Sequence, residues 1–180
     1  DNVVQRTGCQ YDSSLKKYTL TVWGHQYCVD LNARKILPVT DAPRPYQEFL
    51  YLFIVFYLIQ ARNIYPTRQW VSEKDIPGGA AFFRGPHTIP THLITQKAAN
   101  DPDRFKQTAL SLGGQPLDMA DAAFYFEITP QIPVAVLFWQ GDEDFPAEAR
   151  LLFDKNINAH LPLDIIFALA VEVCHAFTRE

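Results

Sequence analysis

The sequence lacks most of the features that place a protein in a class at first sight. Its 180 residues include one Met and three widely spaced Cys with no C-x-x-C pair, so no metal cluster, zinc ribbon or redox pair is indicated. No block of Lys or Arg occurs and the net charge is −4, which gives no electrostatic basis for binding nucleic acid or an anionic membrane surface. The longest apolar run, at 49–59, is too short to cross a bilayer and predicts a buried helix.

The motifs of well-marked enzyme classes are also absent. The chain has no G-x-S-x-G elbow, P-loop, G-x-G-x-x-G turn or H-E-x-x-H helix, and none of its Ser residues stands in a nucleophile setting. The odd number of Cys and the missing signal segment lead us to expect a cytoplasmic protein. We also expect the start at Asp1 to be processed or to belong to a longer product.

What is present predicts one α+β domain over residues 1–180. A hydrophobic content of 48% is enough for a real core. Short β-type runs separated by turn signals predict an N-terminal antiparallel meander in 1–40, followed by a core in 45–180. Strands and helices follow one another without a βαβ rhythm, which indicates the α+β class.

Within the core we expect mixed central strands packed by a buried helix and a C-terminal helix. Residues 122–129 and 133–139 predict the strands, and the second is apolar enough to lie centrally in its sheet. Apolar residues nearly all round predict that the helix at 46–61 is buried on most sides. Apolar residues spaced by three and four predict the C-terminal helix from Ile165 to Phe177.

Local signals define the middle of the chain. Asp101 as N-cap, Pro102 at the first helical position and Gly113 or Gly114 as the stop predict a helix between them. A further helix is expected at 91–99. The segment AAFF at 80–83, bounded by Gly and Pro, predicts a short strand within a stretch of mostly loop chemistry.

The segment FWQGDEDFPAEARLLFD, at 138–154, places several carboxylates after an apolar strand. Asp142, Glu143 and Asp144 have the oxygen-rich character that Mg²⁺ or Ca²⁺ prefers, although the pattern of a calcium loop is missing. The alternative is that Pro146 begins a helix and that the acids lie at its positive end. The sequence leaves open a cap or solvated loop, a contact with a ligand or partner, and a metal site.

A second candidate lies on the loop FFRGPH. Arg84 can recognise a carboxylate or phosphate in a fork, and His87 can donate, accept or ligate a metal. Such residues gather on loops that a rigid scaffold carries. The structural alternative is that Arg84 pairs with an acid of the same protein, for example Asp121 or Asp142, and that His87 is an internal hydrogen-bonding group.

Several segments together resemble a prokaryotic family called domain of unknown function 3786. They are GGAAFFRGPH, LGG, DAAFYFEITPQIPVAVLFWQGDEDFPAEARLLFD and HLPLD, which span about residues 78–164, and the W-x-G-D-E-x-F-P segment is the most specific. The resemblance implies an occurrence mainly in anaerobes and an association with a small cysteine-ligated iron-sulfur domain of the kind seen in corrinoid proteins. The polar positions that match it are Arg84, His87, Asp121, Trp139, Asp142, Glu143, Asp144 and Asp154.

From these observations we expect an accessory domain that binds a cofactor, a small anionic ligand or a protein partner in anaerobic redox or one-carbon metabolism. The partner that the resemblance implies is an iron-sulfur or corrinoid-related protein, and no particular cofactor is indicated. The loops at 84–87 and 141–144 are expected to meet at one edge of the sheet, with Arg84 holding an anion and Trp139 forming a flat wall. The alternatives are a metal-dependent hydrolase or transferase using Asp142, Asp144 and His87, and a structural subunit of a larger complex.

Overall fold

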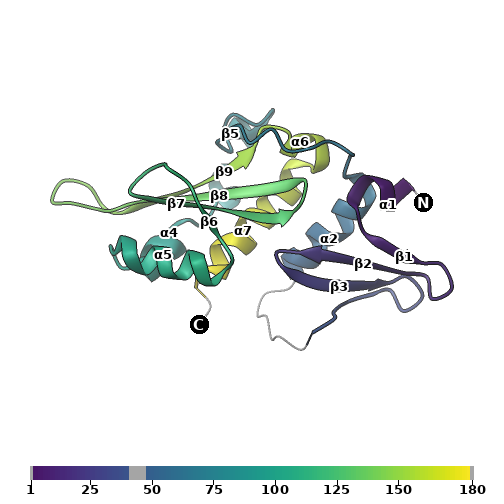
Figure 1. The fold of residues 1–180 in the computed structure, drawn as a ribbon. Coiled ribbons are helices and arrows are strands. Elements are labelled where there is room, and N and C mark those ends of the chain that lie inside the picture. Colours follow the sequence, from purple (N-terminus) through teal and green to yellow (C-terminus); the bar gives the residue numbers. More distant parts are fainter. Residues whose placement is uncertain (1, 41–47, 179–180) are drawn as a thin grey trace.

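The computed structural model describes residues 2–40 and 48–178, which form two antiparallel sheets with helices between and around them (Figure 1). The first sheet has the strand order β1-β2-β3-β4, so each strand pairs with the next one along the chain. This arrangement confirms the predicted N-terminal meander. Its strands are β1 (Gln10–Asp12), β2 (Lys17–Val22), β3 (His25–Asp30) and β4 (Lys35–Pro38), and a short helix, α1 (Asn2–Thr7), precedes them.

The second sheet has the strand order β5-β9-β8-β7-β6, and its pairs are antiparallel. The two predicted strands form β7 and β8, and the apolar β8 lies at the centre of the sheet as expected. The strands are β5 (Trp70–Val71), β6 (Gln115–Pro116), β7 (Ala122–Thr129), β8 (Ile132–Trp139) and β9 (Glu148–Asp154).

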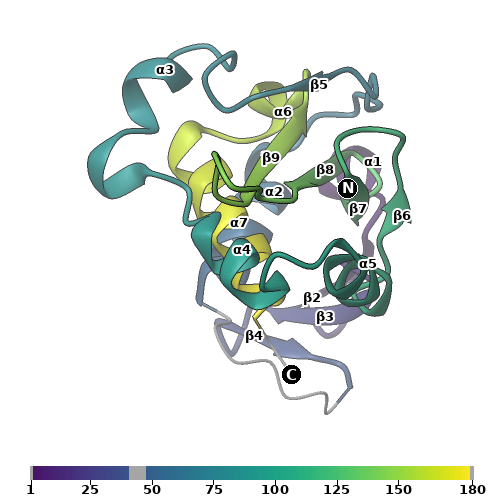
Figure 2. The same cartoon turned by 90° about the vertical axis from the view of Figure 1, so that its left-hand side faces the viewer.

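Three helices, α4 (His92–Ala98), α5 (Pro102–Ser111) and α7 (Leu163–Ala176), pack on one face of the second sheet, where Figure 2 shows them together. Phe105 of α5 stacks on Phe138 of β8 and on Phe177 beyond α7, with ring centroids 5.2 Å and 5.4 Å apart. No helix in the described residues has the length and apolar character that crossing a membrane requires. The remaining elements are α2 (Glu48–Gln60), α3 (Gly79–Phe82), η1 (Gly85–His87) and α6 (Ile157–His160).

The ends of α5 follow the predicted signals. The Asp101 side chain accepts hydrogen bonds from the backbone N–H groups of Asp103 and Arg104, at 2.9 Å and 3.3 Å. Pro102 occupies the first turn, and Gly113 adopts a φ of 78° just after the helix. These contacts satisfy the N–H groups that a helix leaves free at its start, and they allow the chain to turn away at its end.

Trp23, in the turn between β2 and β3, joins the meander to the rest of the molecule. Its backbone N–H donates to the carbonyl of Ile128 at 2.7 Å, and its indole N–H donates to the carbonyl of Leu112 at 3.0 Å. Its ring lies 5.4 Å from that of Phe126. Through these contacts the first sheet, α2, α7 and the second sheet share one continuous buried apolar cluster.

The structure corrects the prediction that the helix at 46–61 is buried on most sides. One side of α2 packs against α7, but Leu52, Val55 and Ile59 are 40%, 38% and 62% exposed. These three side chains are spaced by three and four positions, so they form an apolar stripe on the surface of the helix. The stripe is exposed because a single helix at the edge of the core faces it along one side only. Residues 46–47 of the predicted helix lie outside the described residues.

Two predicted elements are wrong. Residues 80–83 lie mainly in the helix α3 rather than in a strand. Pro146 does not begin a helix, because the chain turns straight back after β8 and continues as β9. In that turn Asp142 Oδ1 accepts from the backbone N–H groups of Asp144 and Phe145, both at 2.9 Å, so the acidic segment closes a hairpin loop instead of capping a helix.

Candidate functional site

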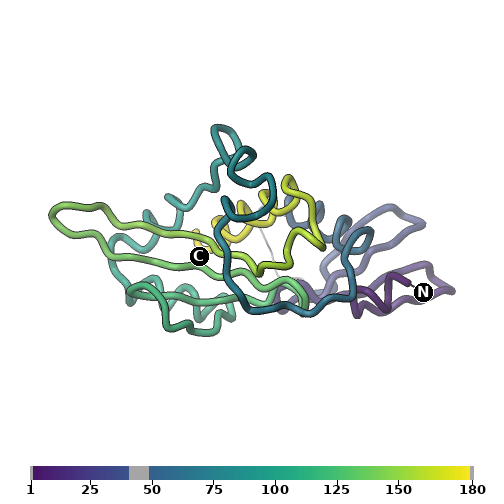
Figure 3. Tube along the Cα trace, turned by 90° about the horizontal axis from the view of Figure 1, so that it is seen from above, coloured from purple at the N-terminus to yellow at the C-terminus, as the bar shows by residue number. Residues whose placement is uncertain are grey.

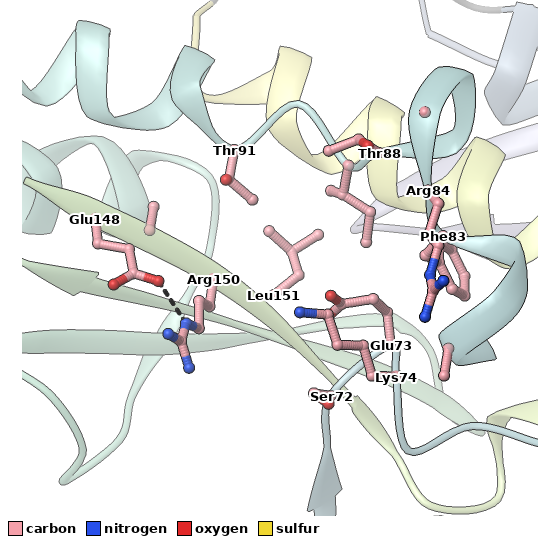
Figure 4. A pocket seen from close by; sticks show the side chains of 14 residues that line it. Ser72, Glu73, Lys74, Phe83, Arg84, Thr88, Thr91, Glu148, Arg150 and Leu151 are labelled. Carbon is pink, nitrogen blue, oxygen red and sulfur yellow. Dashed lines mark hydrogen bonds and ion pairs between the residues drawn. The ribbon is translucent and has the colours of Figure 1, made fainter.

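A cavity of about 680 Å³ opens between β9 and the chain that connects β5 to α4 (Figure 4). β9 forms one wall, and the turn after β5 and the segment around η1 form the others. The site therefore brings together two parts of the chain that are distant in sequence, residues 72–91 and residues 148–151. The residues that line it lie at 72–74, 80, 83–85, 88–89, 91 and 148–151.

The connecting chain is held in place by local contacts. Asp75 Oδ2 accepts from the Ser72 hydroxyl at 2.6 Å, and this hydrogen bond, with one from the Ser72 backbone, lowers the pKa of the Asp75 carboxyl. At Gly79 an added Cβ would lie 1.9 Å from the carbonyl oxygen of Glu73, so only glycine allows α3 to approach the turn this closely. The turn that carries Lys74 is thus positioned against α3 and the segment that carries Arg84.

Two cationic side chains in the cavity have no partner within the described part of the chain. Arg84 is exposed and its guanidinium makes none of the hydrogen bonds or ion pairs there, and the same is true of the Lys74 ammonium. In Figure 4 the Arg84 side chain extends from the wall near η1, and Lys74 extends from the turn after β5 toward Leu151. Cations in this situation are available to bind an anion.

A third cation, Arg150, is already engaged. Its Nε donates to Glu148 Oε1 at 2.6 Å, and its guanidinium lies 5.5 Å from the centroid of the Trp139 ring. Counting Glu73 as the second acid, the cavity has three cations and two carboxylates among its lining residues. Arg150 and Glu148 compensate one another, and Glu73 offsets one of the two charges of Arg84 and Lys74, so the lining keeps one net positive charge.

Hydroxyl and apolar groups complete the lining. The hydroxyls of Thr88 and Thr91 make no hydrogen bond with the described residues, so both are free to donate or accept. Phe83 and Leu151 contribute apolar surface and are 6% and 2% exposed. The cavity thus combines a few polar groups with an apolar floor, which is the usual composition of a ligand pocket.

Of the two residues predicted on the FFRGPH loop, only Arg84 lines the cavity. Neither Asp121 nor Asp142 pairs with Arg84, so the expected internal ion pair is wrong. The His87 ring stacks on Phe82, with centroids 4.4 Å apart, and meets Phe167 edge-on at 5.3 Å. His87 therefore packs between aromatic rings beside the site instead of pointing into it.

The predicted acids lie elsewhere. Asp121 Oδ2 accepts from the backbone N–H of Gln140 at 2.8 Å, and the backbone hydrogen bonds from Phe145 and Asp144 lower the pKa of Asp142. Figure 3 shows the β8–β9 loop projecting beyond the body of the molecule, away from α3 and η1. The expectation that the loops at 84–87 and 141–144 meet is therefore wrong, and Glu143 and Asp144 are exposed on the projecting loop.

The trio predicted as metal ligands is not assembled. Within residues 2–40 and 48–178, no three His, Cys, Asp or Glu side chains are placed to hold a metal ion together. Asp142 and Asp144 lie on the hairpin loop and His87 lies beside η1. Trp139, predicted as a flat wall of the site, does not line the cavity, and the guanidinium of Arg150 of the same chain lies over its ring.

Asp154, the last position that matches the family resemblance, has a structural environment. It is 1% exposed and accepts from the Thr67 hydroxyl at 3.1 Å and from the backbone N–H groups of Arg68 and Asn156, at 2.6 Å and 2.9 Å. These bonds fix the chain on both sides of the β5–β9 pair. The carboxylate thus accepts three hydrogen bonds from the protein itself.

Sequence reasoning missed Lys74, Arg150 and the two threonines of the cavity. Lys74 lies in a polar turn with no motif around it. Polar and apolar residues alternate at 148–154, which is a strand signal that could have identified Arg150 and Glu148. The interpretation of Pro146 as the start of a helix led away from that signal.

Comparison with known proteins finds one family. Its sequence model, described as Domain of unknown function (DUF3786), matches residues 1–176. The match includes the meander, which the residue-level resemblance did not reach. No curated protein and no solved structure matches the chain. The chain therefore belongs to the family described as Domain of unknown function (DUF3786).

Proposed function

We propose that this domain binds a small anionic ligand, carrying a carboxylate or a phosphate, in the cavity between β9 and the β5–α4 connection. The observation that carries the proposal is the pair of cations, Arg84 and Lys74, that extend into this cavity without a partner among the described residues. An arginine guanidinium matches the two oxygens of such a group in a fork, and lysine adds a point charge. Thr88 and Thr91 offer further hydrogen bonds to the same ligand.

The cellular role and the partner of the domain are also part of the proposal. An accessory role in anaerobic redox or one-carbon metabolism, beside an iron-sulfur or corrinoid-related protein in the cytoplasm, rests on the family resemblance alone. A metal-dependent hydrolase or transferase has less support, because its three ligands would have to come from separate places. A purely structural subunit stays an alternative, and it predicts that no small anion binds in the cavity.

The first experiment is a calorimetric titration at low ionic strength with inorganic phosphate and with succinate. Wild-type protein should bind at least one of them at one site. Arg84→Ala and Lys74→Ala should each weaken binding about tenfold or more, because each removes a charge-assisted contact. Unfolding midpoints of both variants should stay near that of the wild type, since neither side chain bonds to the described residues.

The matched control is Arg104→Ala, which removes an exposed arginine of α5 outside the cavity. It should bind the anion as the wild type does. If phosphate and succinate bind equally to wild type, Arg84→Ala and Lys74→Ala, the contact is non-specific and the proposal is lost. Binding of neither anion to the wild type would favour the structural-subunit alternative.

A further inference from the structure

The cavity also contains the free edge of a strand. β9 pairs with β8 from Trp139↔Glu148 to Val134↔Phe153, which is all of the strand except its last residue. On its other side β5 pairs only with the last two residues, Phe153 and Asp154. The chain then leaves β5 in the turn at 72–75, and no described strand lies beside residues 148–152 on that side.

Hydrogen bonds show which residues of β9 face the free side. In an antiparallel ladder the N–H and C=O of one residue point to the same neighbouring strand, and successive residues alternate. Lys155 N–H donates to the carbonyl of Gln69 at 2.9 Å, one position beyond the Trp70↔Asp154 pair. Lys155 therefore faces the strand β5. Because every second residue faces the same side, Phe153, Leu151 and Ala149 also face that side.

The opposite edge of the sheet gives the same result. Leu117 N–H donates to the carbonyl of Ala123 at 2.9 Å, so Ala123 and every second residue of β7 face β6. Ala123 lies opposite Leu137 in the β7–β8 register, and because Ala123 faces β6, Leu137 faces β9. Leu137 lies opposite Arg150 in the β8–β9 register, so these two residues form a hydrogen-bonded pair. Arg150 thus faces β8, and its neighbours Ala149 and Leu151 face away from it.

The backbone groups of Ala149 and Leu151 are therefore unpaired at the floor of the cavity. Both residues line it, and they are only 4% and 2% exposed. None of the hydrogen bonds that the structure gives for the described residues reaches their N–H or C=O groups from the free side. Buried backbone groups in native proteins almost always have a partner, so this edge lacks one that a ligand can provide.

We propose that the cavity takes an extended peptide that adds to the free edge of β9 beside Ala149 and Leu151, with an acidic group of the peptide held by Arg84 and Lys74. This inference rests on the proposed anion site and names the class of its ligand. Addition of a strand to an exposed sheet edge is a common mode of peptide recognition, in which the main chain gives affinity and neighbouring pockets give specificity. The partner is an acidic segment because the unpaired cations give the cavity its excess positive charge.

The dimensions fit a short segment. Strand residues rise by about 3.3 Å in both strands of a pair, so the free stretch at 148–152 accommodates a peptide of about five residues. Alternate side chains of that peptide would face Phe83 and Ile89 on the apolar wall, while the others would point toward solvent. The added strand would continue the line of β5, which ends where the cavity begins.

The first test uses the free protein and needs no ligand. Amide hydrogen exchange followed by NMR should show Arg150 and Leu152 protected by β8, with Ala149 and Leu151 exchanging roughly tenfold faster or more. Equal protection of all four amides in the monomer would mean that the edge is already paired and would overturn the inference. Protection that appears only as the protein dimerises at high concentration would make the occupant a second copy of the chain and would also overturn it.

The second test uses acetylated pentapeptides built from Val, Ile and Thr with Asp or Glu at one end. Binding should slow exchange at Ala149 and Leu151, and Arg84→Ala should weaken it about tenfold. N-methylation of every second peptide nitrogen should abolish binding when the methylated nitrogens are those that face β9. It should leave binding unchanged when they are the nitrogens that face away from β9. Ala149→Pro should weaken peptide binding, because it removes a backbone N–H on the free side of the edge strand, where proline is otherwise tolerated.

These experiments distinguish the proposed anion site from the proposed addition of a peptide strand to β9. Phosphate binding without protection of either amide by any pentapeptide leaves an anion site and overturns strand addition. Failure of phosphate, succinate and the peptides alike overturns both. N-methylation that weakens binding equally at every position would also count against a strand, since a ladder contacts only every second nitrogen.

Discussion

Single side chains in this protein divide into those that the fold uses and those that it leaves free. Asp154 is the clearest of the first kind, because three donors point at one carboxylate that is 1% exposed. Arg84 and Lys74 are of the second kind, with charged groups that no described residue pairs. Replacing a residue of the first kind should change stability, and replacing one of the second kind should change binding.

Asp154→Ala should lower the free energy of unfolding by about 3 kcal/mol, since it strands the backbone N–H groups of Arg68 and Asn156 without an acceptor. Urea unfolding followed by circular dichroism measures the loss. The control is Asp118→Ala, an exposed carboxylate with no bond to the described residues, which should leave the midpoint unchanged. A midpoint for Asp154→Ala equal to that of the control would show that the carboxylate does not hold the β5–β9 junction.

At the scale of elements, the cavity depends on how closely α3 approaches the turn after β5. Gly79→Ala should cost about 2–3 kcal/mol, because the new methyl group collides with the Glu73 carbonyl and backbone must move to relieve it. The same movement displaces Lys74, so phosphate binding should weaken as well. Urea unfolding and the calorimetric titration check the two effects.

Gly113→Ala is the matched control for Gly79→Ala. Gly113 has a φ of 78°, but no atom lies within 4 Å of an added Cβ, so its replacement should cost only about 1 kcal/mol of backbone strain. Phosphate binding should not change, because Gly113 lies outside the cavity. Equal losses of stability and of binding for the two glycine variants would contradict the close-approach argument.

For the molecule as a whole, the dependence of stability on pH should reflect His160. This side chain is 1% exposed and its Nδ1 accepts from the backbone N–H of Arg62 at 3.3 Å. Burial lowers the pKa of His160 below its usual value of 6.5, although the nearby Asp154 acts in the opposite direction. The unfolded chain therefore binds a proton more readily than the folded one, and stability falls as the pH drops below about 6.5.

Unfolding midpoints at about pH 7.5 and about pH 5 should show this loss in the wild type and much less of it in His160→Asn, which keeps an acceptor near Nδ1. His92→Asn, at an exposed position, should behave as the wild type does. The carboxyls with a lowered pKa, such as Asp75 and Asp142, lose their contribution only at lower pH. An unchanged pH profile in His160→Asn would assign the loss to other groups.

The sequence by itself determined the elements whose signals are local. Turn residues defined the meander, Asp101 and Pro102 placed the start of α5, and continuous apolar character placed β8 at the centre of its sheet. Arg84 was singled out from its loop alone, and the structure places it in the lining of the cavity, while its role in binding stays a prediction. In each case the decisive interactions lie within a few residues or follow from burial, which sequence patterns report directly.

Only the tertiary structure decided what surrounds those elements. Residues 148–154 became a strand because β8 supplied a hydrogen-bonding edge, and this pairing separated the acids of the hairpin loop from Arg84. The site depends on where β5 stops pairing with β9 and on how closely Gly79 meets Glu73, which are contacts between distant segments. Such contacts leave no periodic signal in the chain, because each depends on backbone geometry that forms only when the whole molecule folds.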